Sequence, residues 1–242
     1  MRDDAHDNAR EVPVEIEVSS LVIDEEEHAA LALMLSPAER ARAESFVFEW
    51  DRRRFVAARA RLRQLVAARI GTCPESVQFR AASRGKPSIV RTASAPDLRF
   101  NLSHCDDLAA YAFTIGREVG IDIERVRTLR DADAIAVRFF SAAENAAYQA
   151  LEPEARPVGF FNCWTRKEAF IKAVGEGFAL PLDTFDVSLA PGEEPRIIRV
   201  GEASGDECGW RLSSFLPGPG FVGAVVVHSG PSRNEPVGHI AP

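Results

Sequence analysis

A repeat with a period of 105 residues constrains the fold of this chain more than any other feature of its sequence. When the sequence is shifted by 105 positions, "SPAE" at 36–39 coincides with "SAAE" at 141–144. Each motif is a serine followed three residues later by a glutamate, the pattern of a capping box at the start of a helix. The same ungapped shift aligns two further pairs of segments: "EIEV" (15–18) with "GIDI" (120–123), and "RFVAARARLR" (54–63) with "GFFNCWTRKE" (159–168).

The repeat predicts the order of elements in each half: a strand, a short capped helix, a long helix and then further strands. Identity between the halves is low, so coincidence is the alternative, but the common register favours duplication. We therefore expect an α+β chain of two similar lobes in a pseudo-twofold arrangement, over residues 12–115 and 116–228, with a ligand site in the cleft between them. The polar or Pro/Gly/Ser-rich segments 1–11 and 229–242 are predicted to be disordered tails.

Composition and charge exclude several classes of protein. The 242 residues carry a net charge of −7, which argues against a general nucleic-acid binder. No apolar run approaches the roughly 18 residues that cross a membrane, and the N-terminal segment lacks the apolar stretch of a signal peptide. We therefore expect a cytoplasmic protein with no membrane and no nucleic-acid partner. Four cysteines without CxxC spacing predict reduced thiols rather than a zinc site or disulfides: Cys73, Cys105, Cys163 and Cys208.

The segment "VGIDIERVR" (119–127) carries the first candidates for a metal site. Alternate residues of a strand point to the same face, so Asp122 and Glu124 bring two carboxylates together. Their mutual repulsion predicts a cation between them. Hard carboxylate oxygens with open positions suit Mg²⁺. The alternative, which these residues alone support equally, is neutralisation by Arg125 or Arg127.

A predicted helix over about 157–175 adds a third carboxylate. Glu168 and Lys172 are four residues apart there, so they lie on one face of the helix. An isolated pair of this kind is an ordinary surface ion pair worth a few tenths of a kcal/mol. The aromatic and glycine-rich context of "WTRKEAFIKAVGEG" (164–177) instead favours a site in which Glu168 packs across the strand of 119–127.

Three other segments offer hydrogen-bond donors for a phosphate group. In the helix predicted over 50–70, three arginines form one stripe, which is either a solvated face paired with acidic neighbours or a phosphate-binding row. The loop "SRGKPSI" (83–89) combines a glycine with a lysine, and "NLSH" (101–104) ends an apolar run with a serine and a histidine. The candidates are Arg52, Arg59 and Arg63 in the helix, and Lys86, Ser103 and His104 in the loops.

Four motifs are weak singly but specific in this order: "GKP" (85–87), "FNLSH" (100–104), "GIDIE" (120–124) and "WTRKEAFIKAVGEG" (164–177). The set resembles the 4′-phosphopantetheinyl transferases of the larger, pseudo-dimeric class, over about residues 12–228. This resemblance implies two similar α+β lobes with the site between them. It also implies transfer of the 4′-phosphopantetheine arm of coenzyme A to a serine of an apo carrier protein, with release of 3′,5′-ADP. Such carriers are the acyl and peptidyl carrier domains of fatty-acid, polyketide and peptide synthases.

The resemblance also implies roles for individual residues. Mg²⁺, or Mn²⁺ in its place, would be held by Asp122, Glu124 and Glu168. Glu168 would also accept the proton of the carrier serine, and Lys172 would stabilise the departing phosphate. Ligands of the coenzyme A phosphates would be Lys86, Ser103, His104 and Lys167, with Arg59 or Arg63 at the 3′-phosphate.

Two other classes of function stay open at this level. One is a non-catalytic module of the same fold that binds coenzyme A or a carrier protein, and the presence of all three carboxylates and Lys172 argues against it. The other is a Mg²⁺-dependent nucleotide phosphohydrolase, which the "GKP" and "FNLSH" motifs argue against. Because one chain contains both halves of the cleft, we expect a monomer.

Overall fold

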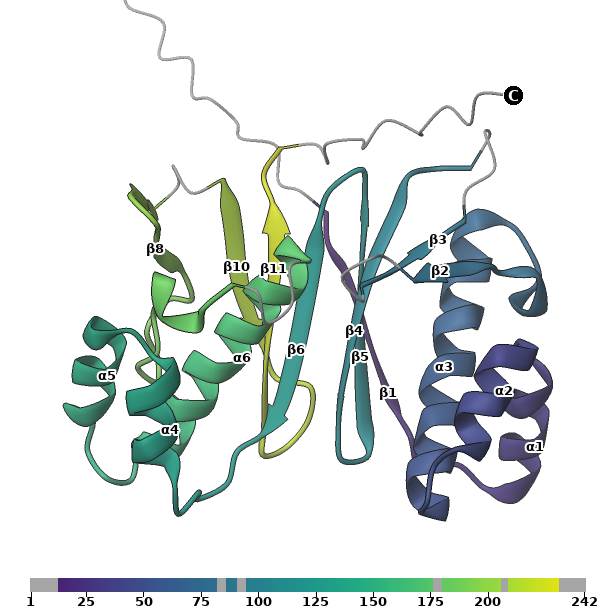
Figure 1. Cartoon of the computed structure of the whole chain (residues 1–242), viewed down its shortest axis with the longest axis horizontal. Coiled ribbons are helices and arrows are strands. Elements are labelled where there is room, and N and C mark those ends of the chain that lie inside the picture. Colours follow the sequence, from purple (N-terminus) through teal and green to yellow (C-terminus); the bar gives the residue numbers. More distant parts are fainter. Residues whose placement is uncertain (1–12, 82–85, 91–94, 176–179, 206–208, 231–242) are drawn as a thin grey trace, which may run out of the picture.

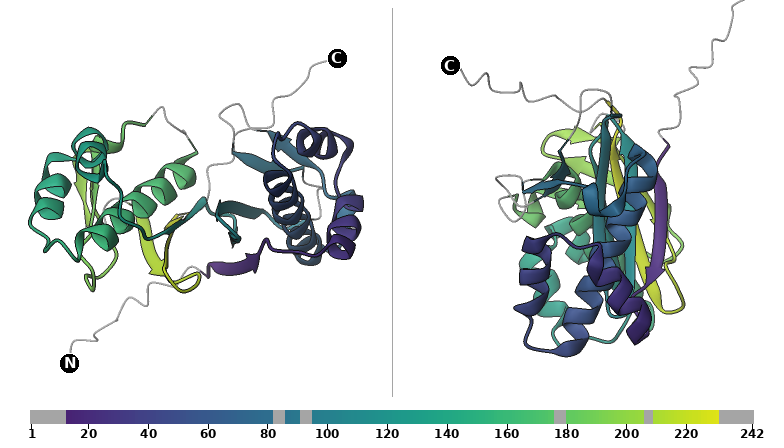
Figure 2. Two further views of the ribbon diagram at one scale, coloured as in Figure 1. Left: turned by 90° about the horizontal axis from the view of Figure 1, so that it is seen from below. Right: turned by 90° about the vertical axis from the view of Figure 1, so that its right-hand side faces the viewer.

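The structure of the chain is a computed structural model, which describes residues 13–81, 86–90, 95–175, 180–205 and 209–230. Figure 1 shows two groups of helices at opposite ends of the molecule, with long strands between them. The left view of Figure 2 shows the same arrangement from below. Apart from residues 229 and 230, the segments predicted to be tails lie outside the described residues.

Within its described residues, the first lobe contains two short helices, one long helix and five strands. Its elements are β1 (Glu15–Ser20), α1 (Glu25–Leu33), α2 (Pro37–Glu44), α3 (Glu49–Ile70), a 3-10 turn (Pro74–Ser76), β2 (Phe79–Ala81), β3 (Pro87–Ile89), β4 (Leu98–Cys105) and β5 (Leu108–Ile115). The second lobe has the same order, with one more strand after its long helix among the described residues. Its elements are β6 (Val119–Arg125), α4 (Ala132–Phe139), α5 (Ala142–Gln149), α6 (Arg156–Val174), a 3-10 turn (Leu182–Thr184), β7 (Phe185–Val187), β8 (Ile197–Val200), β9 (Ala203–Ser204), β10 (Trp210–Phe215) and β11 (Phe221–His228).

The two main sheets have the same topology. In the first lobe the strand order is β1-β5-β4, and in the second it is β6-β11-β10, with antiparallel pairing throughout. In each lobe the first strand therefore pairs with the last one. Smaller sheets, β2-β3 and β7-β8-β9, follow the long helix of each lobe. This correspondence confirms the expected α+β fold of two similar lobes.

Both predicted capping boxes are formed. The Ser36 hydroxyl accepts a hydrogen bond from the Glu39 amide at 3.3 Å, and the Glu39 carboxylate accepts one from the Ser36 amide at 2.8 Å. Ser141 and Glu144 make the same two bonds at 3.2 and 2.8 Å. Each box satisfies amide groups that have no partner within the helix, and this fixes where α2 and α5 begin.

The long helices depart from the predicted ungapped register by one residue. Helices α2 and α5 correspond with an offset of 105, because they span Pro37–Glu44 and Ala142–Gln149. By contrast, α3 and α6 end at left-handed glycine caps only 104 positions apart, Gly71 and Gly175, with φ values of 70° and 78°. The alignment of 54–63 with 159–168 is therefore wrong by one position. The sequence alone could not reveal this difference, because both helices mix apolar and charged residues, and a shift of one position aligns them about equally well.

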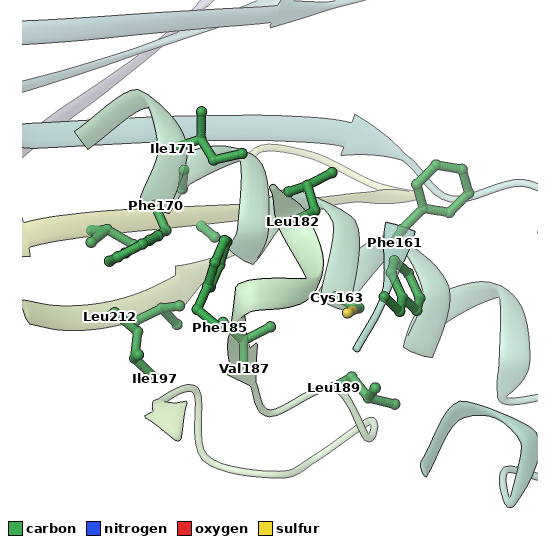
Figure 3. Close-up of a cluster of buried hydrophobic side chains, with 14 of the residues drawn as sticks. Phe161, Cys163, Phe170, Ile171, Leu182, Phe185, Val187, Leu189, Ile197 and Leu212 are labelled. Atoms are coloured by element: carbon green, nitrogen blue, oxygen red, sulfur yellow. The ribbon is translucent and has the colours of Figure 1, made fainter. Parts of the chain in front are cut away.

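The core of the second lobe lies between α6 and the strands beside it. Figure 3 shows Phe170 of α6 directed toward Phe185 of β7, with ring centroids 4.5 Å apart, while Leu212 of β10 lies in the same buried cluster. On its other side α6 contacts β6 at Gly120. A Cβ atom there would lie 2.1 Å from the carbonyl oxygen of Ala169. The backbones of β6 and α6 therefore touch, which brings the strand and the helix of the candidate carboxylates together.

Strands β4 and β6 join the two lobes through side chains. Within the described residues, β6 pairs through its backbone with β11 and with no strand of the first lobe. Alternate residues of β4 bridge the gap: Asn101 Oδ1 accepts a hydrogen bond from the Ile121 amide at 2.9 Å, and Cys105 Sγ accepts one from the Arg125 amide at 3.3 Å. We call the row of Asn101, Ser103 and Cys105 the β4–β6 seam.

Two further sequence expectations concern thiols and membranes. Cys73, Cys105 and Cys163 are free thiols, whereas Cys208 lies outside the described residues. Over the part of the chain that the structure describes, no helix combines the length and the hydropathy needed to span a bilayer.

Candidate active site

Asp122 is the most buried of the candidate carboxylates, with 5 % of its surface exposed. Its Oδ1 atom accepts hydrogen bonds from Ser103 Oγ at 2.8 Å and from Lys172 Nζ at 2.7 Å. Its Oδ2 atom is buried and has no partner. Because an unpaired buried carboxylate oxygen is costly, Oδ2 has the character of a ligand atom for a cation.

Glu124 and Glu168 lie close enough to Asp122 for its negative charge to affect both carboxyl groups. Burial raises the pKa of Glu124, and the charge of Asp122 raises it further. Burial and then the charge of Asp122 also raise the pKa of Glu168, while Lys172, four residues along α6, acts in the opposite direction. Both pKa shifts come first from burial and then from the negative charge of Asp122, so a cation bound here would lower the cost of keeping these carboxyl groups charged.

The carboxylates face one region but do not form a closed cage. Among the described residues, no three His, Cys, Asp or Glu side chains converge at metal-binding distance. The Lys172 ammonium lies against Asp122 instead. Of the arginines considered as an alternative, Arg127 lies 3.8 Å from Glu124 in an exposed pair, and Arg125 pairs with Asp106. The unpaired Asp122 oxygen and the raised pKa values fit a divalent cation held by oxygen ligands.

A cavity of about 590 Å³ lies next to this cluster, in the first lobe. Partial burial lowers the pKa of His104, and the charges of Lys172 and Arg54 lower it further, so His104 lies within electrostatic reach of both the cluster and the cavity. Arg54 is held in place by two hydrogen bonds to Asp107 Oδ1, at 3.0 and 2.7 Å. The polar lining of the cavity comprises Arg42, Asp51, Arg54, Arg59, His104 and Asp106.

Two of these cavity residues, Arg42 and Arg54, were not among the sequence candidates. Arg42 belongs to the short helix α2, and Arg54 to the first turns of α3. Neither falls in one of the four motifs. The sequence held one indication of Arg54, which lies five residues before Arg59 in the arginine-rich helix. The packing of α2, α3 and β4 is what brings these residues to one cavity.

The structure removes Arg63 and Lys167 from the candidate site. Arg63 is 2 % exposed and pairs with Glu39 at 2.7 Å, and it also donates to two backbone carbonyl groups. Lys167 is 1 % exposed and pairs with Glu144 at 2.7 Å, with two further bonds to carbonyl groups. The two residues are counterparts, because each bonds the capping-box glutamate of its lobe. Both side chains are enclosed in the core by these partners, which does not fit the predicted contact with a bound phosphate.

The remaining cationic candidates have protein partners. Lys86 donates to Glu118 at 2.8 Å and to the carbonyl oxygen of Ala173 at 3.1 Å, so it links the first lobe to the end of α6. Arg59 pairs with Glu39, and its guanidinium lies 4.2 Å from the centre of the Phe79 ring. It still lines the cavity. Lys86 and Arg59 stay predicted ligands of coenzyme A, which would have to compete with these protein partners for their charged groups.

Arg52, the first arginine of the predicted stripe, forms a surface ion pair. It contacts Glu49 at 2.5 Å, one turn earlier on α3. For Arg52, this agrees with the interpretation of the arginine stripe as a solvated helix face paired with acidic neighbours. Of the three arginines, only Arg59 borders the cavity.

Comparison with known proteins places these features in a family. A model of the 4′-phosphopantetheinyl transferase superfamily matches residues 118–225, and a model of the N-terminal part of 4′-phosphopantetheinyl transferases matches residues 23–115. The chain is also 38 % identical over 197 residues to the 4′-phosphopantetheinyl transferase HetI of Nostoc sp., a match that covers 81 % of this chain and 80 % of that protein. The chain belongs to the 4′-phosphopantetheinyl transferase superfamily.

Other 4′-phosphopantetheinyl transferases give concordant matches. Sfp of Bacillus subtilis is 30 % identical over 167 residues, covering 69 % of this chain and 72 % of Sfp. The human L-aminoadipate-semialdehyde dehydrogenase-phosphopantetheinyl transferase is 29 % identical over 165 residues, covering 65 % of this chain and 53 % of the human protein. The family expected from the motifs is confirmed. This phosphopantetheinyl transferase is an enzyme that transfers phosphopantetheine to carrier proteins.

Proposed function

We propose that Asp122, Glu124 and Glu168 form the reaction centre of this transferase and hold Mg²⁺, or Mn²⁺ in its place. At this centre the 4′-phosphopantetheine arm of coenzyme A passes to a serine of an apo acyl or peptidyl carrier protein, and 3′,5′-ADP is released. The observation that carries the proposal is the buried, unpartnered Oδ2 atom of Asp122 between two carboxyl groups of raised pKa.

The reaction needs positive charge where the pyrophosphate of coenzyme A is cleaved. When bound, the divalent cation neutralises the pyrophosphate oxygens and the charge that develops on the departing ADP. Lys172 adds a fixed ammonium beside the cluster, 2.7 Å from Asp122 and 3.1 Å from Ser103. We assign Lys172 to the leaving phosphate, since its side chain is partly exposed and its ammonium is accessible to a bound ligand.

Glu168 is the residue that we assign as the base. The carrier serine must lose its proton as its oxygen attacks the phosphorus, and a carboxylate of raised pKa accepts a proton more readily than an ordinary surface glutamate. Glu168 lies on the same face of α6 as Lys172, one turn away. Base and leaving-group cation are thus supplied by one helix, whose backbone contacts the strand that carries Asp122.

The cavity beside the cluster is the proposed seat of the nucleotide end of coenzyme A. Arginine guanidinium groups match the geometry of phosphate oxygens, and Arg42, Arg54 and Arg59 line the cavity together with His104. We therefore propose that these residues contact the 3′-phosphate. Ser103 donates to Asp122 in the protein alone, and this position between cavity and cluster supports a contact with the pyrophosphate.

The remaining features of the proposal follow from the fold. We propose lobes over residues 12–115 and 116–228 that act together as a cytoplasmic monomer. The support for this is that the elements on both sides of the site belong to one chain, with β4 from the first lobe and β6 and α6 from the second.

Intact mass spectrometry tests the proposed function. The protein is mixed with coenzyme A, an apo carrier protein and Mg²⁺, and a mass gain of about 340 Da, the mass of the transferred arm, is expected on the carrier. Addition of EDTA is expected to abolish the gain. A full gain in the presence of EDTA contradicts the metal assignment. No gain with any of several carriers contradicts the assigned substrate class, and release of inorganic phosphate from a nucleotide without a carrier supports a phosphohydrolase instead.

Replacement of the proposed base separates catalysis from binding. At saturating metal, Glu168→Gln is expected to lower kcat about 100-fold or more, because removal of a general base typically costs that much, while the KM for coenzyme A changes little. Glu154→Gln, at an exposed position just before α6, is the matched control and leaves both constants unchanged. Equal losses in kcat and in coenzyme A binding contradict the role of base and make Glu168 a ligand only.

A further inference from the structure

Glu124 is held less firmly than Asp122, its neighbour among the proposed metal ligands on β6. Asp122 receives two strong hydrogen bonds, whereas the contact of Glu124 with Arg127 is 3.8 Å long and half exposed to solvent. A pair of this kind does little to fix a side chain. Among the described residues, the hydrogen-bond donor to the Glu124 carboxylate is the thiol of Cys105, with Sγ 3.5 Å from Oε2.

Cys105 lies two residues after Ser103 on β4, and it donates to Glu124 as Ser103 donates to Asp122. Ser103 Oγ donates to the first carboxylate of β6, and Cys105 Sγ donates to the second. Because side chains alternate in both strands, the spacing of two between Ser103 and Cys105 matches the spacing of two between Asp122 and Glu124. Each carboxylate of β6 therefore has its own donor on the facing strand.

The thiol is itself held in position. Cys105 Sγ accepts the Arg125 amide at 3.3 Å, so the sulfur atom uses its donor and its acceptor capacity on two neighbouring groups of β6. The turn that follows Cys105 is tied on both sides. Asp106 pairs with Arg125 of β6, and Asp107 pairs with Arg54 of α3 at 2.7 Å. The end of β4 thus presents the thiol to Glu124 from a fixed backbone.

We propose that Cys105 is a positioning residue, whose thiol orients the Glu124 carboxylate for the divalent cation. This role rests on the proposed function of the carboxylate cluster. Groups that hydrogen-bond a ligating carboxylate restrict its orientation, and their loss typically weakens metal binding by 10- to 100-fold. A thiol is a weak donor, so we expect an effect at the lower end of that range, about 10-fold.

Binding of Mn²⁺ to the full-length protein, measured by the electron paramagnetic resonance of the free ion, tests the proposal without turnover. Cys105→Ala is expected to weaken Mn²⁺ binding about 10-fold, and Cys105→Ser is expected to restore it, because a hydroxyl donates to the same oxygen. In the transfer reaction, the loss in Cys105→Ala is expected to be greater at limiting than at saturating metal. Cys73→Ala, which removes an exposed thiol of the first lobe, is the matched control.

The outcomes separate this role from the function on which it rests. Wild-type Mn²⁺ affinity in Cys105→Ala overturns the role of Cys105 alone. A Cys105→Ser variant that binds as weakly as Cys105→Ala shows that the side chain only fills space, and this also overturns it. If the wild-type protein binds no Mn²⁺, the proposed metal site falls, and the positioning role falls with it.

Discussion

Asp122→Ala is expected to reduce transfer at least about 1000-fold, the largest loss that any single side chain of the cluster should cause. The carboxylate supplies the unpartnered Oδ2 atom and holds Ser103 and Lys172 through Oδ1. Without this carboxylate, the cation loses a ligand and the Lys172 ammonium loses its hydrogen-bond acceptor. Several kcal/mol of charge stabilisation disappear with the metal, and about 4 kcal/mol corresponds to this factor.

The same substitution should leave the fold intact. Asp122 is buried without full hydrogen bonding, and its removal relieves repulsion with Glu124 and Glu168. Lys172 loses its partner but is partly exposed, so water can solvate its ammonium. We therefore expect a thermal midpoint close to that of the wild type, together with loss of Mn²⁺ binding.

Carrier modification and Mn²⁺ affinity are the measurements for Asp122. Asp122→Asn is the companion variant, because the amide keeps the shape and removes only the charge. Asp131→Ala, at an exposed position before α4, controls for a change of one negative charge. Wild-type turnover of Asp122→Ala at limiting Mg²⁺ is the result that contradicts the assignment.

Gly120→Ala is expected to destabilise the second lobe by about 3 kcal/mol or more and to abolish transfer. The added Cβ would lie 2.1 Å from the carbonyl oxygen of Ala169 and 2.3 Å from the amide nitrogen of Ala173. Both are backbone atoms of α6, so no side-chain rotation relieves the overlap, and strand and helix must separate. Separation would move Asp122 away from Glu168, which is why activity should fall with stability.

Urea unfolding measures the stability change for Gly120, and circular dichroism shows whether the helices persist. Gly218→Ala is the matched control. A Cβ at that position would meet only a leucine methyl group at 3.3 Å, which can shift at little cost. Wild-type stability of Gly120→Ala would mean that β6 and α6 are not in direct backbone contact.

Features encoded by neighbouring residues were predictable from the sequence. The capping boxes depend on a serine and a glutamate three positions apart, and both formed as expected. The pairing of Asp122 with Glu124 on one strand face depends only on strand geometry. Such patterns act within four residues, so no tertiary contact is needed to recognise them.

Features decided by packing were not predictable in this way. Lys167 and Glu168 are adjacent on α6, yet one side chain is buried beside Glu144 and the other faces the candidate site. The elements packed around α6, which are β6, β11, α5 and β7, decide which of its faces is enclosed. The β4–β6 seam likewise has no local signal, because nothing in either strand indicates that its neighbour will bond through side chains.

The two lobes have main sheets of the same topology, but they do not carry the same acidic residues. The shift that superposes β1 on β6 puts Glu17 at the position of Asp122 and Ser19 at that of Glu124. In the long helix, the shift of 104 puts Gln64 at the position of Glu168. The first lobe thus keeps one acid of three, and Glu17 is neutralised by Arg69 at the surface. In the proposed function the three carboxylates come from the second lobe, while the first lobe supplies the cavity and two donors to these carboxylates, Ser103 and Cys105. Substitutions of the cavity arginines should therefore change the affinity for coenzyme A, whereas substitutions of the carboxylates should change turnover.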